Sequence, residues 1–358
     1  MKRELIYSAA YPSFLLSYLI HHPGLRNRIY SDIVTFWFRP IAGRLKLPYI
    51  EAMFEYPPIS GFLTYLAALI GGDIHGFYTA FSIIILIFYT ILIESTYRIA
   101  AEKRVNEFLL IIFLALSPSM ILYSVYNFDV IFSAILMSSL LLLKRRRSLS
   151  AILFGLAMLT KWANLILLPV ALMLIEGWKN RIKYSMISLG SFISVNLILY
   201  LINPELMPET YLHHLEWGLE NAWFIVFFPN NASWDTAKIF SFMLMGYGLL
   251  KVYLCKLGDL YEKSFMAYSV FLLTTYKFTP QMVVWILPFL ALMNRIPWGY
   301  FMLEFANAGI ILTWFDSPDP TRLGSLPQYL AILRAIILFY ILVDVYLGLK
   351  RRRAHASA

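Results

Sequence analysis

Apolar runs separated by short polar intervals extend along almost the whole sequence. Three of the longest runs cover residues 76–98, 186–202 and 330–349, and 60% of all residues are hydrophobic. A soluble domain of 358 residues would carry more apolar surface than it can bury, whereas a lipid bilayer can cover such surface. The pattern therefore predicts an all-α, polytopic integral membrane protein in contact with membrane lipids.

Basic residues gather in short clusters between these runs. Residues 144–147 and 350–353 both read KRRR, and each cluster directly follows an apolar run. Such clusters are typical of cytoplasmic loops, according to the positive-inside rule. The net charge of +9 therefore indicates contact with anionic lipid headgroups and not with nucleic acid.

The lengths of the runs and the basic clusters predict the topology. We expect about twelve transmembrane helices with both termini in the cytoplasm. Residues 57–71 are apolar but too few to cross the bilayer, so a short interfacial helix is expected there. A crossing at this segment would place every strong basic cluster outside the cytoplasm.

A single membrane domain is expected over residues 1–358, because the sequence contains no linker that would separate a soluble domain. Its predicted parts are a core over 1–300, extracytoplasmic loops at 21–75 and 203–235 within that core, and C-terminal helices at 301–358. The middle of the predicted spans is almost free of charge, which favours a reaction at the outer surface over transport through the membrane.

The first predicted loop contains the polar interval IYSDIVTFWFRPIAGRLKLPYIEAMFEYPP, residues 29–58, with the acids Asp32, Glu51 and Glu55. A carboxylate in a membrane-associated site can take a proton from an alcohol, so Asp32 is interpreted as a catalytic base. The alternative is that Asp32 caps the helix that follows it. Glu51 and Glu55 would share a face if their segment were helical, and they are interpreted either as substrate contacts or as a solvated acidic face.

Other polar side chains lie at the outer ends of the predicted spans. Asn127 and Asp129 are predicted to bind substrate, with helix capping by Asn127 as the alternative. Lys161 and Lys277 are predicted to contact a phosphate, and the alternative is that each ammonium extends to the membrane interface.

His213 and His214 follow in the second large loop. A zinc site is not predicted, because neither a nearby cysteine nor an HxxxH spacing accompanies them. They are interpreted as groups that assist at the substrate, or else as solvated surface histidines.

Five segments together support a family resemblance. They are Asp32 followed by PYIE and EYPP, YNFDVI at 126–131, LTKWANLILLP at 159–169, YLHHLEW at 211–217 and YKFTPQMVVWILP at 276–288. In this combination they resemble the GT-C superfamily of membrane glycosyltransferases, which use polyprenyl-phosphate sugars. The likeness is strongest to the mannosyltransferase that adds the first mannose in GPI-anchor assembly and to bacterial phosphoinositide mannosyltransferases. The chain departs from the pattern at Val34, where a second acid is usual, at Asn164 in place of a proline, and at Thr279 in place of a serine.

The resemblance implies a GT-C fold and an inverting transfer of a hexose, mannose above others, from a polyprenyl (dolichyl) phosphate to an extracytoplasmic glycan, lipid or protein. It implies Asp32 as the general base and no metal cofactor. Donor-phosphate contacts are expected from Lys161, Lys277 and Gln281. Substrate contacts are expected from Glu51, Glu55, Tyr56, Asn127, Asp129, His213 and His214. The alternatives are a transporter or lipid-linked-sugar flippase, and an interaction subunit of a glycosylation complex.

Overall fold

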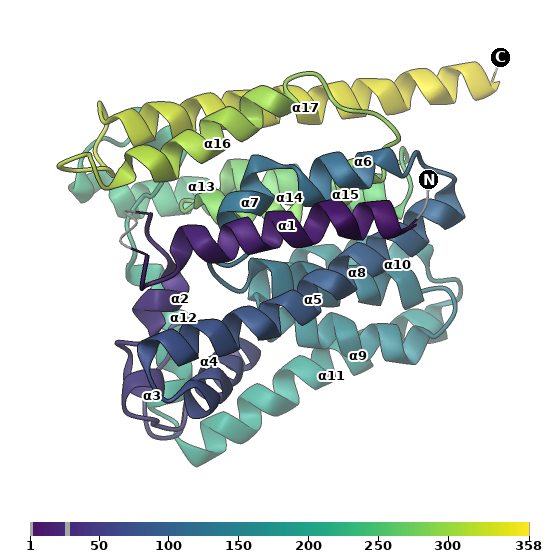
Figure 1. Cartoon of the computed structure of the whole chain (residues 1–358). Coiled ribbons are helices and arrows are strands. Elements are labelled where there is room, and N and C mark those ends of the chain that lie inside the picture. The colour runs from purple at the N-terminus through teal and green to yellow at the C-terminus, as the bar shows by residue number, and fades with distance from the viewer. Residues whose placement is uncertain (1–2, 26–28, 358) are drawn as a thin grey trace. The chain divides into compact units, whose positions relative to one another are not determined.

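The computed structural model describes residues 3–25 and 29–357, and Figure 1 shows that these residues fold almost entirely into helices. The described part of the chain contains no β-strand, and its β-type pairing is limited to the isolated bridges Pro48–Ala52 and Glu220–Lys277. The all-α class expected from the apolar runs is therefore confirmed for these residues.

Within the described residues, four helices are long and apolar enough to cross a membrane. They are α5 (Ile74–Lys103), α11 (Trp178–Ile202), α13 (Trp234–Leu254) and α17 (Leu326–Ser357). Large apolar side chains on two of them are open to the surroundings, since Leu201 on α11 and Met243 on α13 are each 71% exposed. Lipid is the environment that suits such surfaces, so these helices support a membrane protein. The number of twelve spans and the cytoplasmic termini stay predictions.

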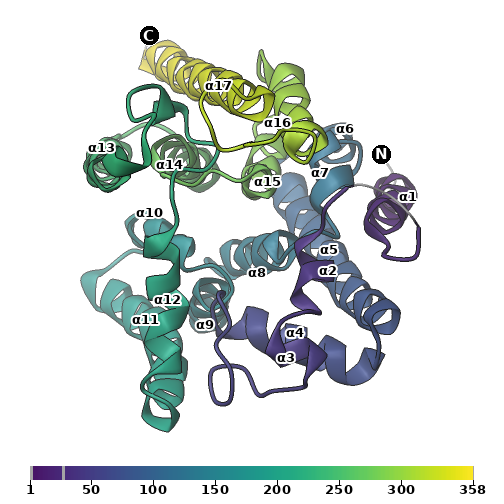
Figure 2. The ribbon, with the colours of Figure 1, turned by 90° about the vertical axis from the view of Figure 1, so that its left-hand side faces the viewer.

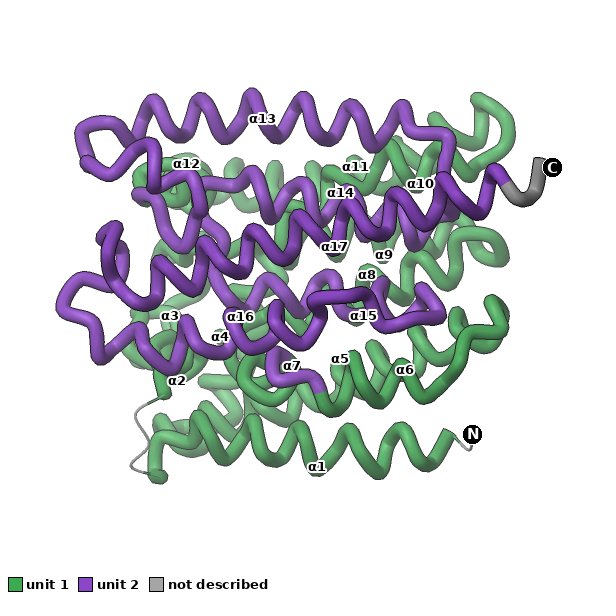
Figure 3. The backbone as a smooth tube through the Cα atoms, turned by 90° about the horizontal axis from the view of Figure 1, so that it is seen from above, with its two compact units in different colours: residues 1–116, 120–217 green, residues 117–119, 218–358 purple. Residues whose placement is uncertain are grey.

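The chain divides into two compact units, which Figure 3 colours green and purple. Unit 1 comprises Met1–Leu116 and Met120–Trp217, and unit 2 comprises Ser117–Ser119 and Gly218–Ala358. Each unit is described by itself below.

In unit 1, α5 contacts both α4 and α8, and α9 contacts both α8 and α11 (Figure 2). The short segments before α4 and between α7 and α8 carry most of the polar side chains discussed below. The helical elements of this unit other than α5 and α11 are α1 (Arg3–His21), α2 (Asp32–Phe36), α3 (Pro40–Gly43), α4 (Pro58–Gly71), α6 (Phe108–Leu110), η1 (Ile111–Ala115), α7 (Pro118–Tyr123, whose first residues belong to unit 2), α8 (Asp129–Leu142), α9 (Arg147–Met158), η2 (Trp162–Leu167), α10 (Leu168–Leu174) and α12 (Leu206–Glu216).

Helix α4 corresponds to the apolar segment 57–71 that was expected not to cross. Pro58 occupies its first turn, where a missing backbone N–H costs nothing. Its 14 residues give a length of about 21 Å, which is shorter than the hydrocarbon core of about 30 Å. A tight turn at Gly71 and Gly72 leads into α5, and a Cβ on Gly71 would lie 2.1 Å from the backbone nitrogen of Phe77.

In unit 2, α16 and α17 lie side by side, and α14 contacts both α13 and α17 (Figure 1). Leu219, Ala222, Phe224, Ile225, Ala237 and Tyr276 form a buried apolar cluster. This cluster packs the chain after Gly218 against the residue that precedes Lys277. The remaining elements of the unit are η3 (Trp223–Val226), η4 (Asn231–Ser233), α14 (Leu260–Thr274), η5 (Pro280–Trp285), α15 (Leu287–Ala291) and α16 (Tyr300–Trp314).

Candidate functional site

Asp32 is the first residue of α2 in unit 1. The N-cap position of this short helix is occupied by Ser31, so Asp32 is not its N-cap residue. The backbone N–H of Ile33 donates to the carbonyl oxygen of Tyr126 at 3.2 Å. This bond holds the start of α2 beside the segment that leads into α8.

Asn127 connects Asp32 to a third segment of the chain. Its Nδ2 donates to Asp32 Oδ2 at 2.6 Å and to the hydroxyl oxygen of Tyr56 at 2.9 Å. The Asn127 side chain is completely buried, and the N-cap of α8 is Phe128. Asn127 therefore joins side chains, and its Oδ1 also accepts from the backbone N–H of Phe128 at the start of α8, so both interpretations of Asn127 stay predictions.

Lys161 brings a cation to the same place. Its Nζ lies 3.5 Å from Asp129 Oδ1, 3.5 Å from Asn127 Oδ1 and 4.8 Å from the centroid of the Tyr56 ring. The lysine side chain is 11% exposed, and the Asp129 side chain is fully buried. The ammonium is thus directed toward buried groups of the protein. We call Asp32, Tyr56, Asn127, Asp129 and Lys161 the Asp32 cluster.

Tyr56 is the neutral hydrogen-bonding member of the cluster. Burial raises the pKa of its phenol well above the ordinary value, and the Asp32 and Glu55 carboxylates raise it further. Its ring packs on Phe128 at 5.1 Å and on Phe36 at 5.5 Å between ring centroids. These apolar rings lower the polarity on one side of the cluster and so strengthen the electrostatic interactions there.

Glu55 lies next to the cluster and is held by an arginine. Nε and Nη2 of Arg39 donate to Glu55 Oε1 at 3.0 Å and 2.6 Å. Glu55 is buried, whereas the Arg39 side chain is 47% exposed. Arg39 was not among the predicted site residues, although its position in the polar interval just before Pro40 was a usable signal.

Glu51 lies apart in its own turn. Its Oε2 accepts from the backbone N–H of Leu47 at 2.7 Å, and its Oε1 is 3.9 Å from Lys46 Nζ. Residues 50–55 form turns and no helix. The shared helical face considered for Glu51 and Glu55 is therefore absent.

The two predicted histidines lie on α12 and have different neighbours. The His214 ring is 6.1 Å from the Tyr56 ring and 4.6 Å from the Trp217 ring, between centroids. His213 Nε2 accepts from the indole N–H of Trp217 at 3.2 Å. His214 is thus adjacent to the Asp32 cluster, and His213 is turned toward Trp217.

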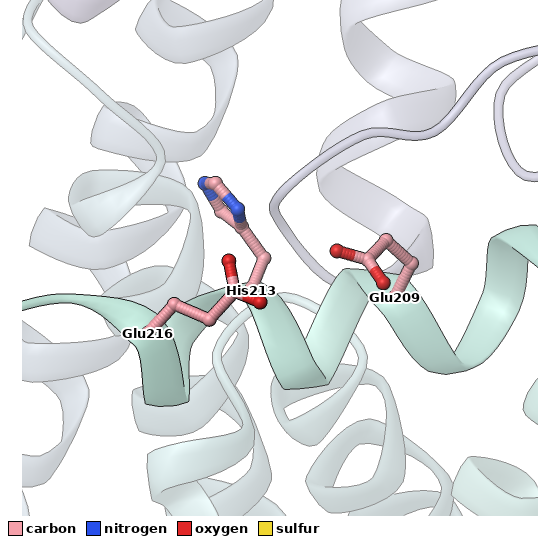
Figure 4. A group of neighbouring side chains, drawn as sticks. All are labelled: Glu209, His213 and Glu216. Atoms are coloured by element: carbon pink, nitrogen blue, oxygen red, sulfur yellow. The ribbon is translucent and has the colours of Figure 1, made fainter.

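One group of side chains in the described part of the chain has the composition of a metal site. Glu209, His213 and Glu216 of α12 offer ligand atoms within 4.8 Å of one another (Figure 4). An imidazole with two carboxylates suits several divalent transition metals. However, Glu216 is exposed and the Nε2 of His213 already accepts from Trp217, so the group lacks the buried geometry of a preformed centre.

The other predicted phosphate ligands, Lys277 and Gln281, belong to unit 2. Lys277 Nζ lies 3.0 Å from Glu220 Oε2. The backbone supports this ion pair, because Glu220 N donates to Tyr276 O at 3.1 Å and Phe278 N donates to Glu220 O at 3.0 Å. Gln281 lies in η5 and is buried. The structure thus gathers Asp32, Tyr56, Asn127, Asp129 and Lys161 in unit 1 and places Lys277 and Gln281 in a second polar region.

Two charged residues that are at most 1% exposed were not predicted. Glu304 on α16 is 1% exposed and Arg334 on α17 is fully buried. Both residues lie within apolar runs in which no site residue was predicted. The signal was present in the sequence, because an isolated arginine inside the apolar run 330–349 is costly and rarely occurs without a function.

Comparison of the chain with protein-family models and with curated proteins finds no match. The geometry of the two polar regions therefore carries the functional argument.

Proposed function

We propose that this protein is an inverting membrane glycosyltransferase of the GT-C type. It moves a hexose, mannose above others, from a polyprenyl (dolichyl) phosphate to an extracytoplasmic glycan, lipid or protein. The observation that carries the proposal is the Asp32 cluster. There a carboxylate, a buried amide and a neutral phenol from segments distant in sequence are joined by hydrogen bonds, with an ammonium beside them.

The cluster supplies the groups that such a transfer needs. The oxygen of an acceptor hydroxyl attacks the anomeric carbon as the bond between that carbon and the phosphate oxygen breaks. Asp32 takes the hydroxyl proton, and polyprenyl phosphate leaves with the bonding electron pair. Asn127 orients the Asp32 carboxylate through its bond to Oδ2.

The remaining roles are assigned by charge and position. Lys161 stabilises negative charge that develops near the cluster, and Lys277 and Gln281 of unit 2 bind the donor phosphate. Glu55, Tyr56, Asp129 and His214 contact the sugar or acceptor, whereas Glu51 and His213, which are bonded within their own turn and helix, contribute little to that contact. Because the donor carries a single lipid-linked phosphate, the proposed reaction uses no divalent metal.

A transporter or lipid-linked-sugar flippase is the second candidate. It is favoured by the buried Glu304 and Arg334, since charged residues inside membrane helices also mark transport pathways. The two candidates differ in their need for a base. Transport does not require Asp32 to accept a proton from an alcohol, whereas transfer does.

The test compares two isosteric substitutions in the full-length protein, purified in lipid nanodiscs. Asp32→Asn and the control Asp235→Asn are incubated with radiolabelled polyprenyl-phosphate mannose and a total lipid and glycan extract, with EDTA present. Asp235 is suitable because its side chain is 94% exposed and paired with Lys238. Loss of a general base is expected to slow product formation by about 100-fold or more in Asp32→Asn and to leave the control near the wild-type rate.

The wild-type protein must transfer sugar from at least one polyprenyl-linked donor, and failure with all of them contradicts the proposal. If Asp32→Asn transfers sugar at the wild-type rate, Asp32 is not the base. Movement of the labelled donor across sealed vesicles without any product supports the flippase instead.

A further inference from the structure

A buried arginine in the C-terminal helix bonds to the backbone around Lys277. Arg334 is fully buried although α17 is one of the four helices apolar enough to cross a membrane. A charged side chain in that position is costly unless polar groups replace its water. Nη1 of Arg334 donates to Asn307 Oδ1 at 2.8 Å, and Nη2 donates to the carbonyl oxygens of Asn221, at 3.3 Å, and Phe278. The guanidinium carbon also lies 3.6 Å from the centroid of the Phe278 ring.

These contacts hold both sides of the Glu220–Lys277 bridge. Asn221 follows Glu220 and Phe278 follows Lys277, so one guanidinium nitrogen ties the two segments together. These three acceptors are neutral and replace the water that would otherwise solvate the guanidinium.

Asn307 extends the same support to the start of η5. Its Nδ2 donates to the carbonyl oxygen of Pro280 at 3.0 Å and to Ser119 Oγ at 2.9 Å. The backbone on both sides of Thr279 is therefore fixed by contacts that lead back to α16 and α17.

The two segments held in this way contain buried polar atoms that lack partners. Among the described residues, no hydrogen-bond partner is present for Nδ2 or Oδ1 of Asn221, Oγ1 of Thr279 or Oε1 of Gln281. All three side chains are buried, at 1%, 6% and 7% exposure. Buried polar atoms in folded proteins are normally paired, so their concentration next to Lys277 indicates a place where a polar ligand completes the bonding.

We propose that Asn221, Thr279 and Gln281 together with Lys277 bind the hexosyl phosphate of the lipid-linked donor, and that Arg334 is the positioning residue of this site. The donors, the Asn221 amide, the Thr279 hydroxyl and the Lys277 ammonium, suit phosphate oxygens. The acceptors, Asn221 Oδ1 and Gln281 Oε1, suit sugar hydroxyls. The proposal rests on the proposed function for the identity of the ligand, and it adds Asn221, Thr279 and Arg334 to the residues that recognise it.

The site is tested by binding, without any acceptor. Asn221→Asp keeps the size of the side chain and adds a negative charge to the proposed phosphate site. Asn294→Asp is a matched control, because Asn294 has the same φ of 55° in unit 2 and is exposed. The affinity of the full-length protein for polyprenyl-phosphate mannose is expected to fall at least about tenfold in Asn221→Asp and to stay unchanged in Asn294→Asp.

The positioning role is tested with Arg334→Gln, and Arg351→Gln on the same helix is the control, because Arg351 is exposed. Donor affinity is expected to fall about tenfold in Arg334→Gln, while the KM for the acceptor stays unchanged. Amide hydrogen exchange over residues 276–281 is expected to accelerate in this variant only. If Arg334→Gln does not fold, Phe278→Leu is the milder variant, because it removes the ring beside the guanidinium and keeps the carbonyl.

Unchanged donor affinity in both Asn221→Asp and Phe278→Leu overturns the site. Inorganic phosphate that binds as tightly as the lipid-linked donor overturns the assignment to a hexosyl lipid. If the variants change donor affinity as expected but the wild-type protein never transfers sugar, the binding site is supported and the transferase function is contradicted. Failure of the site and failure of the proposed function are therefore distinguishable.

Discussion

The two polar regions of the molecule use their hydrogen bonds differently. In unit 1, Asp32 and Asn127 are joined by a bond between side chains, and the Asn127 amide also reaches the Tyr56 hydroxyl. In unit 2, Arg334 donates to the backbone carbonyls of Asn221 and Phe278. Bonds between side chains fix reactive groups relative to one another, whereas bonds to carbonyls fix the path of the chain. The first region is therefore suited to chemistry and the second to holding a binding segment.

The two regions also differ in how their buried cations are balanced. Lys161 lies 3.5 Å from an oxygen of the buried Asp129 carboxylate. Arg334 has neutral acceptors in Asn307 and in two carbonyls. A second substitution can remove the partner charge in unit 1, but no side-chain substitution can remove a backbone carbonyl in unit 2. This difference leads to the prediction with the largest expected effect on stability.

Lys161→Met is expected to lower the free energy of unfolding by about 3 kcal/mol, because it leaves the buried Asp129 carboxylate without its cation. Adding Asp129→Asn removes that charge, so the double variant is expected to recover at least half of the loss. Reversible unfolding in mixed detergent and SDS micelles measures both values.

The control for Lys161→Met is Lys238→Met, because the partner of Lys238, Asp235, is 94% exposed. An exposed pair contributes little, so the change should stay below about 0.5 kcal/mol. If the double variant at Lys161 and Asp129 is no more stable than Lys161→Met, the loss of stability does not come from an unpaired Asp129 carboxylate. The contrast between the two buried cations is then contradicted.

Tyr56→Phe has a smaller expected effect. It removes the hydroxyl that accepts from Asn127 at 2.9 Å, and it should cost about 1 kcal/mol of stability and slow transfer about fivefold. The pKa of Tyr56 is raised in the folded protein, so the neutral phenol is favoured there. Its stabilisation is therefore fully present below the ordinary tyrosine pKa of about 10 and is lost as pH rises through the higher folded value.

Comparison of wild type with Tyr56→Phe at several pH values tests this pH dependence. The stability difference between wild type and Tyr56→Phe should be constant from about pH 6 to pH 9 and should shrink above about pH 10, as followed by unfolding in SDS at each pH. A difference that grows in alkaline solution contradicts the assignment, because it would require a lowered pKa.

The helical class was predictable from the sequence because lipid leaves few choices. A segment surrounded by hydrocarbon must satisfy its backbone hydrogen bonds internally, so apolar runs such as 186–202 become helices. The contacts of the Asp32 cluster were not predictable in the same way. Asp32 and Asn127 are 95 residues apart, and their approach depends on how α2 packs beside the start of α8.

Local features explain the predictions that failed. Glu51 and Glu55 were considered as one helical face, but the Pro48–Ala52 bridge and the bond from Leu47 to Glu51 hold this segment in turns. Arg334 was passed over because the surrounding run is strongly apolar. A search for single charges inside apolar runs would have found it.

The smallest expected effect comes from Glu51, and Glu55 provides its matched comparison. Glu55→Gln weakens the two bonds from Arg39 to a buried carboxylate, and transfer should slow a few-fold, by about 1 kcal/mol or less because Arg39 is half-exposed. Glu51→Gln changes a side chain that is 44% exposed and bonded within its own turn, so the rate should change by less than about twofold. Parallel transfer assays of the two variants give the comparison. If Glu51→Gln slows transfer as much as Glu55→Gln, substrate contacts extend beyond the Asp32 cluster into the turn around Glu51, and chemistry in unit 1 is not confined to its buried side chains.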